Sequence, residues 1–329
     1  MDSQENSVLI SQDFFEDGIP VDISRVFPVV VMATMSSGKS TLINSLLGKD
    51  ILPRSNTACT AKVYSILDND DDESTKVFLT DRQGHICTTT ADTSAVLDMA
   101  NQCEDISHIT ISGQIRGVLN TRRTLLIIDT PGTNNSLDES HREITRKVLE
   151  KINGGLIIYV INATQMGIND DKYLLTDVWN YLERKPEFSV LFVVNKVDEI
   201  DMEKESLKDL ILDTQEYLKG LGFKNPNILP VSALAANLFN KVLNGEQITR
   251  KEGRSFNYAF ELYKPAGMNL VAYAITRDYP NPYDFIEVNS KKYSVSDIVG
   301  ALNNTGIPYL ERLIQNAQIL SESYSKELG

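Results

Sequence analysis

Short apolar runs alternate with longer amphipathic stretches along most of the chain from about residue 25 onward. The apolar runs are rich in valine, isoleucine and leucine, and they are continuous rather than alternating. That pattern is typical of strands buried on both faces, as in a parallel sheet. It predicts five strands, at Val26–Ala33, Arg123–Asp129, Gly155–Asn162, Phe188–Asn195 and Ile228–Ser232.

Helical periodicity fills the intervals between these strands. It predicts helices at Lys39–Leu47, Asp138–Asn153, Asp170–Arg184, Met202–Leu221 and Ala233–Asn244. Parallel strands joined through helices form right-handed crossovers, and repeated crossovers place helices on both faces of one sheet. The predicted fold class is therefore α/β, a doubly wound and mostly parallel sheet, in which ligands bind at the carboxyl ends of the strands.

Residues 61–115 have a different pattern, which predicts an extension of the sheet. Its strands are expected at Ala61–Leu67, Thr75–Thr80 and Ile109–Gln114, in an antiparallel or mixed arrangement. The acidic run Asp68–Glu73 separates the first two strands, and because clustered carboxylates resist burial we expect a solvated hairpin tip there. A calcium loop is the less favoured alternative, since the glycine and the spacing of such a loop are missing.

After Asn244 the alternation of strands and helices stops. Residues 245–292 contain several glycines, prolines and aromatic residues, which predict an insertion of uncertain fold with helices around Ser255–Tyr263 and Met268–Thr276. Residues 294–325 predict two helices broken near Gly306-Ile307-Pro308. We therefore divide the chain into an N-terminal segment (1–25), an α/β domain (26–244), the insertion (245–292) and C-terminal helices (293–329).

Charge and hydropathy narrow the classes of partner. The 329 residues include 32 Lys and Arg against 45 Asp and Glu, a net charge of −13. Such a surface disfavours nucleic acid as a partner and non-specific adhesion to anionic lipid. The N-terminus lacks the pattern of a signal peptide, and the longest apolar runs, Val26–Met35 and Gly154–Ala163, are too short to span a bilayer. We expect a cytoplasmic protein, with peripheral membrane contact left open.

The strongest chemical signal is the segment Ala33-Thr-Met-Ser-Ser-Gly38-Lys39-Ser40-Thr41, which follows a predicted strand and opens a predicted helix. This is the placement of a phosphate-binding loop, whose backbone N–H groups, including those of Ser36 and Ser37, face the phosphates. Lys39 would place its charge on the β- and γ-phosphates, and the Ser40 hydroxyl would ligate Mg²⁺. Ala33 replaces the usual first glycine, which is tolerable if its backbone is in an ordinary conformation.

Two further motifs complete a nucleotide site. Asp129-Thr-Pro-Gly132 closes a predicted strand, so that Asp129 can hold the hydration shell of Mg²⁺ and the Gly132 N–H can reach the γ-phosphate. Asn195-Lys196-Val197-Asp198 follows another strand end. The Asp198 carboxylate can accept two hydrogen bonds from guanine, whereas adenine has no such donor pair. Asn195 would position the loop and the Lys196 stem would lie over the ring, while Ser232 and Ala233 supply the fourth side of the pocket.

These motifs, in this order, resemble those of the translation-factor-like P-loop GTPases. The segment Gly48-Lys49-Asp50-Ile51-Leu52-Pro53, followed by Thr60, resembles the dynamin superfamily and the bacterial dynamin-like proteins in particular. The resemblance covers about residues 26–244 and the helices at 294–325. It implies that Thr60, with Thr57 as the competing candidate, orders around Mg²⁺ and the attacking water in the GTP state. It also implies that Ser36 lies near the β–γ bridging oxygen, often with a monovalent cation.

The resemblance also bears on catalysis and assembly. The glutamine that dynamins carry in the loop is Met35 here, and Thr133 follows Gly132 where small GTPases place a glutamine. Dynamins pair two GTPase domains across the nucleotide, and this pairing supplies the ordering of the active site that a glutamine supplies elsewhere. We therefore expect a homodimer through the nucleotide face. The family would couple this cycle to a helical partner or a membrane surface, and in dynamins a stalk begins where this chain stops.

Three functions remain in competition. The first is a dynamin-like GTPase that converts GTP to GDP and phosphate, with Ser36, Lys39, Thr60 and Gly132 as catalytic residues. The second is a soluble switch in which slow hydrolysis times a partner interaction. The third is a GTP-binding module without turnover, favoured only by Ala33 and Met35.

Overall fold

The computed structural model describes residues 25–53, 62–69, 75–89, 93–115, 117–118, 120–131, 139–152, 154–165, 169–201, 206–265, 267–270 and 285–327. The first half contains, in order, β1 (Val26–Ala33), α1 (Lys39–Leu47), β2 (Val63–Asp68), β3 (Lys76–Asp81), β4 (Ile86–Thr89), α2 (Thr93–Gln102), β5 (Ile106–Gly113), β6 (Thr124–Asp129), α3 (Glu139–Lys151) and β7 (Gly155–Asn162). The second half contains the 3₁₀ turn η3 (Ala163–Gln165), α4 (Asn169–Arg184), β8 (Phe188–Asn195), the 3₁₀ turn η4 (Val197–Glu199), α5 (Leu207–Gly220), β9 (Asn227–Pro230), α6 (Ala233–Leu243), α7 (Arg250–Tyr263), β10 (Phe285–Val288), β11 (Lys291–Ser294), α8 (Val295–Asn304) and α9 (Ile307–Glu327).

One nine-stranded sheet forms the centre of the molecule, in the order β4-β3-β5-β2-β6-β1-β7-β8-β9. The strands from β6 to β9 are all parallel to their neighbours. On the other side, β2 is antiparallel to β6 but parallel to β5, and β3 is antiparallel to both β5 and β4. The predicted α/β class with a mostly parallel sheet and a mixed extension is confirmed.

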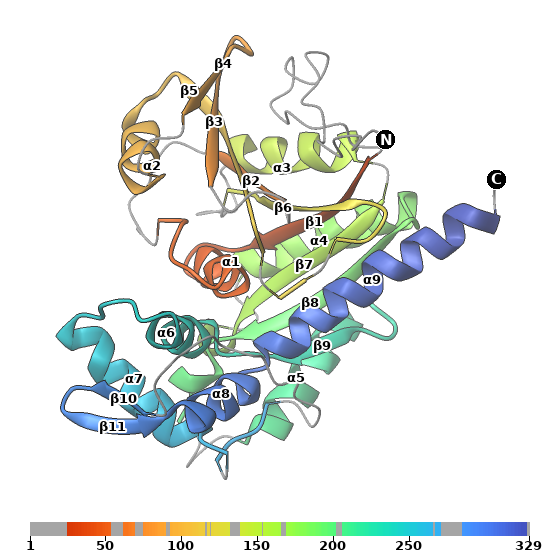
Figure 1. Ribbon diagram of the computed structural model, residues 1–329. Coiled ribbons are helices and arrows are strands. Elements are labelled where there is room, and N and C mark those ends of the chain that lie inside the picture. The colour runs from red at the N-terminus through yellow and green to blue at the C-terminus, as the bar shows by residue number, and fades with distance from the viewer. Residues whose placement is uncertain are drawn as a thin grey trace.

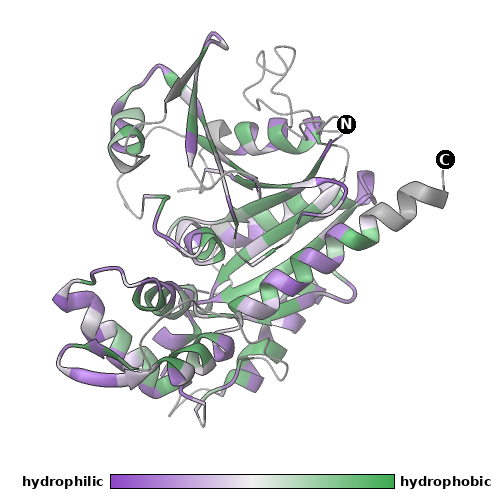
Figure 2. Ribbon diagram, in the orientation of Figure 1, coloured by the Kyte–Doolittle hydropathy of each residue, from purple (hydrophilic) through white to green (hydrophobic). Residues whose placement is uncertain are grey.

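The two faces of the sheet pack against different helices, because successive strand residues point to opposite sides. Val29, Val31 and Ala33 of β1 belong to the core shared with α1, α6, α8 and α9, whereas Val30 and Met32 belong to the core shared with α3 and α4. Figure 1 shows the sheet between these groups, and Figure 2 shows that its central strands are the most hydrophobic part of the chain. Among the described residues, no helix is both long and apolar enough to cross a membrane.

The extension at 61–115 differs from the expectation in one respect. β2 and β3 do not form a hairpin, because β5 lies between them and pairs with both. Asp68 is consequently buried at the end of β2 rather than solvated, and its Oδ1 accepts the Ile115 N–H at 2.7 Å. The remainder of the acidic run, from residue 70 to 73, lies outside the described residues. β4 and α2 were not predicted from the sequence, although Val96, Leu97 and Ala100 of α2 form a buried helical stripe.

The region after α6 is a helical group with one hairpin, at the lower left of Figure 1. The predicted helix at Ser255–Tyr263 is confirmed within α7, and the predicted break between the last two helices falls at Thr305-Gly306, where Gly306 has φ 79°. The predicted helix Met268–Thr276 is wrong over its described residues 268–270. There the Met268 N–H bonds to the Leu262 carbonyl (2.8 Å), and the Leu270 N–H bonds to the Asn304 carbonyl (3.0 Å). These bonds to residues outside the segment take the place of a helical ladder.

The β10–β11 hairpin was not predicted. Its two turn residues, Asn289 and Ser290, both have left-handed backbones with φ 50° and φ 62°. A two-residue hairpin turn of this kind favours Asn-Gly, so Asn-Ser is a weak sequence signal. The hairpin turns the chain into α8, whose Ile298 and Leu302 join the core beneath α6.

Candidate functional site

The phosphate-binding loop lies between β1 and α1, at the carboxyl end of the sheet. Ala33 ends β1 with an ordinary extended backbone, which meets the condition set for a residue replacing glycine. Ser36 (φ 63°) and Gly38 (φ 85°) are both left-handed, and Gly38 is the N-cap residue of α1. Left-handed residues in such a loop turn successive N–H groups toward one side, which makes a concavity suited to an anion. Thr41 lies half-buried in the first turn of α1.

Lys39, Ser40 and Asp129 converge beside this loop. Asp129 is the last residue of β6, where it is in register with Val31 of the adjacent parallel strand β1. The Thr130 hydroxyl donates to the Val31 carbonyl at 2.9 Å and holds this strand end in place. The Lys39 ammonium forms an ion pair with Asp129 Oδ1, and the Ser40 hydroxyl donates to Asp129 Oδ2 at 3.4 Å. We call the loop 33–41 together with Asp129 the phosphate end of the site.

Asn195, at the carboxyl end of β8, joins three motifs. Its Nδ2 donates to the Ser37 carbonyl at 2.9 Å, and its Oδ1 accepts the Ala233 N–H at 3.1 Å. A Cβ on Gly38 would lie 2.5 Å from Asn195 Nδ2, so only glycine permits this approach. The phosphate loop and the segment at Ala233 are far apart in sequence, yet the buried amide of Asn195 sets the distance between them.

Asp198 and Lys196 complete the other end of the site. Asp198 Oδ1 is buried and, among the residues that the structure describes, finds no hydrogen-bond partner. Burial raises the pKa of Asp198, and a hydrogen bond from Ser232 opposes that rise. Lys196 has φ 66°, and its ammonium lies 3.5 Å from Glu199 Oε1. We call Asn195–Asp198 with Ser232 and Ala233 the base end.

Two predicted site residues, Thr60 and Gly132, lie outside the described residues. Ser36 is exposed in the loop, whereas Ser37 is buried and its hydroxyl lies 3.0 Å from that of Thr34. Ser232 is the N-cap of α6, and its hydroxyl accepts the Ala235 N–H at 3.3 Å. The remaining predicted residues therefore lie at the carboxyl ends of β1, β6, β8 and β9, as expected for a ligand site in this class of sheet.

A polar face on α6, not predicted from the sequence, holds the segment after α1. Asp50 of that segment accepts from Asn237 Nδ2 (2.6 Å) and pairs with the Lys241 ammonium (2.7 Å). Asn240 and Asn244 donate to the carbonyls of Ser45 and Gly48, at 3.1 and 2.8 Å. The spacing of these four α6 residues was a usable signal, because one polar stripe on an otherwise apolar helix indicates buried hydrogen bonding.

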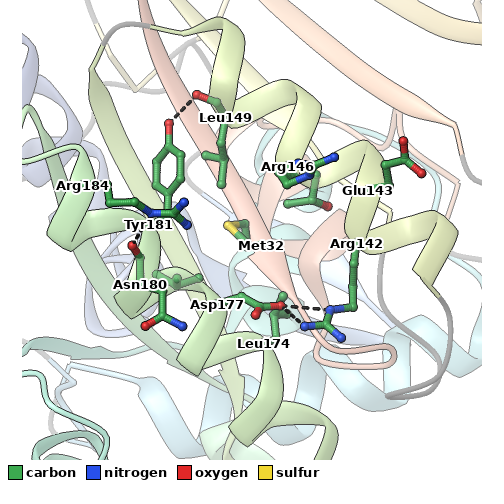
Figure 3. Close-up of a pocket in the computed structure, with 12 residues that line it drawn as sticks. Met32, Arg142, Glu143, Arg146, Leu149, Leu174, Asp177, Asn180, Tyr181 and Arg184 are labelled. Carbon is green, nitrogen blue, oxygen red and sulfur yellow. Dashed lines mark hydrogen bonds and ion pairs between the residues drawn. The ribbon is translucent and has the colours of Figure 1, made fainter.

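A separate cavity of about 420 Å³ lies between α3 and α4, on the face of the sheet that does not pack against α1 and α6 (Figure 3). Three arginines line it, but each is engaged by its own surroundings. Arg142 Nε donates to Asp177 at 2.9 Å, Arg146 lies 3.4 Å from Glu150, and Arg184 donates to the Asn180 carbonyl at 3.0 Å. The cavity contains none of the motif residues.

Comparison with known proteins gives one family match. The model of the Dynamin family matches residues 29–197, which is more than half of the chain and includes both ends of the site except Asp198, Ser232 and Ala233. An uncharacterized protein in the xynA 3′ region of Caldicellulosiruptor sp. (strain Rt8B.4) is 25% identical over 231 residues, covering 69% of this chain and 54% of that protein.

Two solved structures of an oligomerised bacterial dynamin pair, described as providing a mechanism for long-range sensing and tethering of membranes, are similar to this fold. The first has a TM-score of 0.50 and 21% identity, and covers 93% of this chain and 46% of that one. The second has a TM-score of 0.48 and 19% identity, and covers 96% and 52%. The first supports the fold class, and this chain spans about half the length of the proteins it matches.

Proposed function

This chain belongs to the dynamin family, and from that premise we propose that it binds GTP and hydrolyses it to GDP and phosphate with Mg²⁺. The observation that carries the proposal is the position of Asn195. Its side chain bonds the phosphate loop at the Ser37 carbonyl and the base end at the Ala233 N–H. A site that must hold the phosphates and the base of one nucleotide needs this fixed separation.

At the phosphate end, the N–H groups of Ser36, Ser37, Gly38, Lys39, Ser40 and Thr41 surround the phosphates. Lys39 exchanges its ion pair with Asp129 for the β- and γ-phosphates, so its charge is balanced before and after binding. Ser36 stabilises charge at the β–γ bridging oxygen, where a monovalent cation can assist. Thr60 positions the attacking water, a role that rests on the family resemblance, and the Gly132 N–H reaches the γ-phosphate because no side chain blocks its approach.

The residues present fit a magnesium ion. Ser40 Oγ and Asp129 Oδ2 lie 3.4 Å apart and are hard oxygen donors of the kind that Mg²⁺ prefers. No group of three or more His, Cys, Asp or Glu in the described part of the chain could hold a metal alone. The ion would therefore depend on Ser40, Asp129 and Thr60 together with nucleotide oxygens, and when bound it would neutralise charge on the phosphates.

At the base end, Asp198 selects guanine. Its buried Oδ1 has an unmet capacity to accept a hydrogen bond, which the N1–H and amine of guanine supply and adenine does not. The Lys196 stem covers the ring, and Ser232 and Ala233 close the pocket. Met35 and Thr133 occupy positions where a glutamine would orient water, so we propose that a second copy paired across the nucleotide completes the site.

Phosphate release tests the enzymatic proposal. The wild type is expected to release phosphate from GTP and not from ATP, and Lys39→Ala should lower the rate by at least roughly hundredfold, because a charge aimed at the transition state is lost. Lys172→Ala is the matched control, since Lys172 is an exposed lysine on α4. GTP binding without turnover at any protein concentration would contradict hydrolysis and favour a binding module.

Pairing of two domains has its own test. The turnover per molecule should rise with protein concentration, because the productive species is a dimer. A turnover that stays flat over a wide concentration range would instead favour a soluble switch that acts as a monomer. We further propose that the cycle is coupled to a helical partner or a membrane surface; the bacterial dynamin pair, described as tethering membranes, supports the second. Cosedimentation with anionic vesicles in the presence of GTP should detect the second of these, and its absence would favour the helical partner.

A further inference from the structure

The cavity between α3 and α4 combines an apolar floor with a basic rim. The floor consists of four buried side chains, one from β1, one from α3 and two from α4: Met32, Leu149, Leu174 and Val178. Figure 3 shows Met32 near the centre, with Arg142, Arg146 and Arg184 around it. The volume of about 420 Å³ is within the range of cavities that hold small molecules.

Helical periodicity gathers the polar residues of this cavity on two stripes. Arg142 and Arg146 lie one turn apart on α3, and Asp177, Tyr181 and Arg184 follow one another on successive turns of α4. Residues at these spacings share one face of a helix. Because both stripes line the same cavity, charged groups from two helices surround one space.

The two carboxylates that line the cavity each have a cation of their own. Glu143 Oε1 lies 3.0 Å from the ammonium of Lys147, which is outside the cavity on the same helix. Asp177 Oδ2 accepts from Arg142 Nε at 2.9 Å. Neither carboxylate therefore neutralises the other two arginines of the rim.

Arg146 and Arg184 retain capacity to bind an anion. Arg146 lies 3.4 Å from Glu150 in an exposed pair, a kind of pair that contributes little. Arg184 Nε donates to the neutral carbonyl of Asn180 at 3.0 Å. A guanidinium has five N–H donors, and within the described part of the chain the other donors of Arg184 have no acceptor. This local excess of positive charge stands in a chain whose net charge is −13.

We propose that the cavity between α3 and α4 binds a small amphiphilic anion. Its phosphate, sulfonate or carboxylate head group contacts Arg146 and Arg184, and its apolar body covers the floor around Met32. A guanidinium suits such head groups, because its planar N–H donors match two oxygens at once. The cavity contains none of the nucleotide motifs, so this ligand is distinct from GTP and the inference does not depend on the proposed function.

The test uses two fluorescent probes that differ by one charged group. 8-Anilinonaphthalene-1-sulfonate carries a sulfonate, and N-phenyl-1-naphthylamine has the same rings without it. Both are titrated into the full chain with excess GDP, which keeps them out of the nucleotide site. Arg184→Gln should weaken binding of the sulfonate by roughly tenfold, because a charge-assisted hydrogen bond is lost, and should leave the affinity for the neutral probe unchanged. Arg254→Gln is the matched control, an exposed arginine on α7, and should change neither affinity.

Two further measurements locate the bound probe and identify its head group. Val178→Phe fills the floor and should weaken binding of both probes, whereas octyl phosphate should displace the sulfonate more strongly than octanol does. Arg184 is exposed, so Arg184→Gln remains informative even if Val178→Phe folds poorly.

Three results would overturn the inference: no binding of the sulfonate to the wild type, an unchanged affinity for it in Arg184→Gln, or an equal loss for both probes in that variant. GDP affinity measured on the same wild-type sample keeps the two proposals apart. Absence of GDP binding would contradict the proposed function and leave this inference standing.

Discussion

The phosphate end and the base end of the site are built in different ways. The phosphate end is mostly local, because Ala33 to Thr41 form one continuous turn from β1 into α1 and only Asp129 comes from elsewhere. The base end is assembled from distant segments, with Asn195 bonded to Ser37 and Ala233, and Ser232 bonded to Thr305. Local segments leave a signature in sequence, whereas an assembled end depends on how the rest of the chain packs.

The largest expected effect comes from cutting the link between the two ends. Asn195→Ala leaves the Ser37 carbonyl and the Ala233 N–H buried without this partner, which should lower the free energy of unfolding by about 2–5 kcal/mol. GDP affinity should fall with it. Chemical denaturation and nucleotide titration measure both quantities.

The matched control for that variant is Asn162→Ala. Asn162 is in register with Asn195 at the end of the neighbouring strand, but within the described part of the chain its side chain bonds to nearby residues, Thr164 and Gln165. A loss of GDP affinity as large in Asn162→Ala as in Asn195→Ala would show that the link between the two ends is unimportant.

A loss of stability of similar size, without removal of the Asn195 side chain, is expected at the point where the two ends touch. Gly38→Ala places a Cβ 2.5 Å from Asn195 Nδ2, and Gly38 also has φ 85°. The left-handed backbone alone should cost about 1–2 kcal/mol of stability, and displacement of the Asn195 amide should add about 1–3 kcal/mol.

Gly245→Ala separates these two contributions. Gly245 has φ 75°, but a Cβ there would meet no atom within 4 Å, so only the backbone cost applies. Thermal or chemical unfolding of both variants gives the difference. Equal destabilisation would mean that the contact between Gly38 and Asn195 adds nothing.

The polar face of α6 offers a third comparison, because it connects the base side of the molecule to the segment leaving α1. Lys241→Met removes the cation that lies 2.7 Å from both Asp50 and Glu252. Stability should fall by about 1–3 kcal/mol, since two carboxylates lose their shared partner. Lys219→Met on α5 is the control, because Lys219 is exposed and donates to Gln215 on the same helix at 3.2 Å. An unchanged free energy of unfolding in Lys241→Met would show that packing, and not these ion pairs, holds α6 against the segment after α1.

The smallest expected effect is a pH dependence confined to the base end. Burial raises the pKa of Asp198, so this carboxyl takes up a proton at a higher pH than an ordinary aspartate. The protonated group cannot accept both hydrogen bonds from guanine. Inosine diphosphate lacks the exocyclic amine and offers only one of these bonds. The preference for GDP over inosine diphosphate should therefore decline as the pH is lowered. Because both nucleotides carry the same phosphates, their ratio cancels protonation at the phosphate end. A ratio that is constant down to pH 4 would contradict the role of Asp198.

The sequence predicted the parallel half of the fold closely. The strand bounds at Val26–Ala33, Gly155–Asn162 and Phe188–Asn195 match the structure, because continuous runs of β-branched residues specify fully buried strands. The hairpin expected around Asp68 was wrong, since no local pattern reveals that β5, some forty residues later, inserts between β2 and β3. The helix expected at Met268 failed for a similar reason, because its N–H groups bond to Leu262 and Asn304.

The same division holds for the site. The residue types and spacing of Gly38-Lys39-Ser40, Asp129 and Asn195–Asp198 were sufficient to propose GTP as the ligand, because each motif carries its chemistry within a few residues. Only the tertiary structure placed Asn195 against Ser37, Lys241 against Asp50 and Ser232 against Thr305, since contacts between distant segments leave no local periodicity. The sequence by itself determined which groups are available for nucleotide chemistry, and the packing of the helices after β9 decided which other side chains hold them in position.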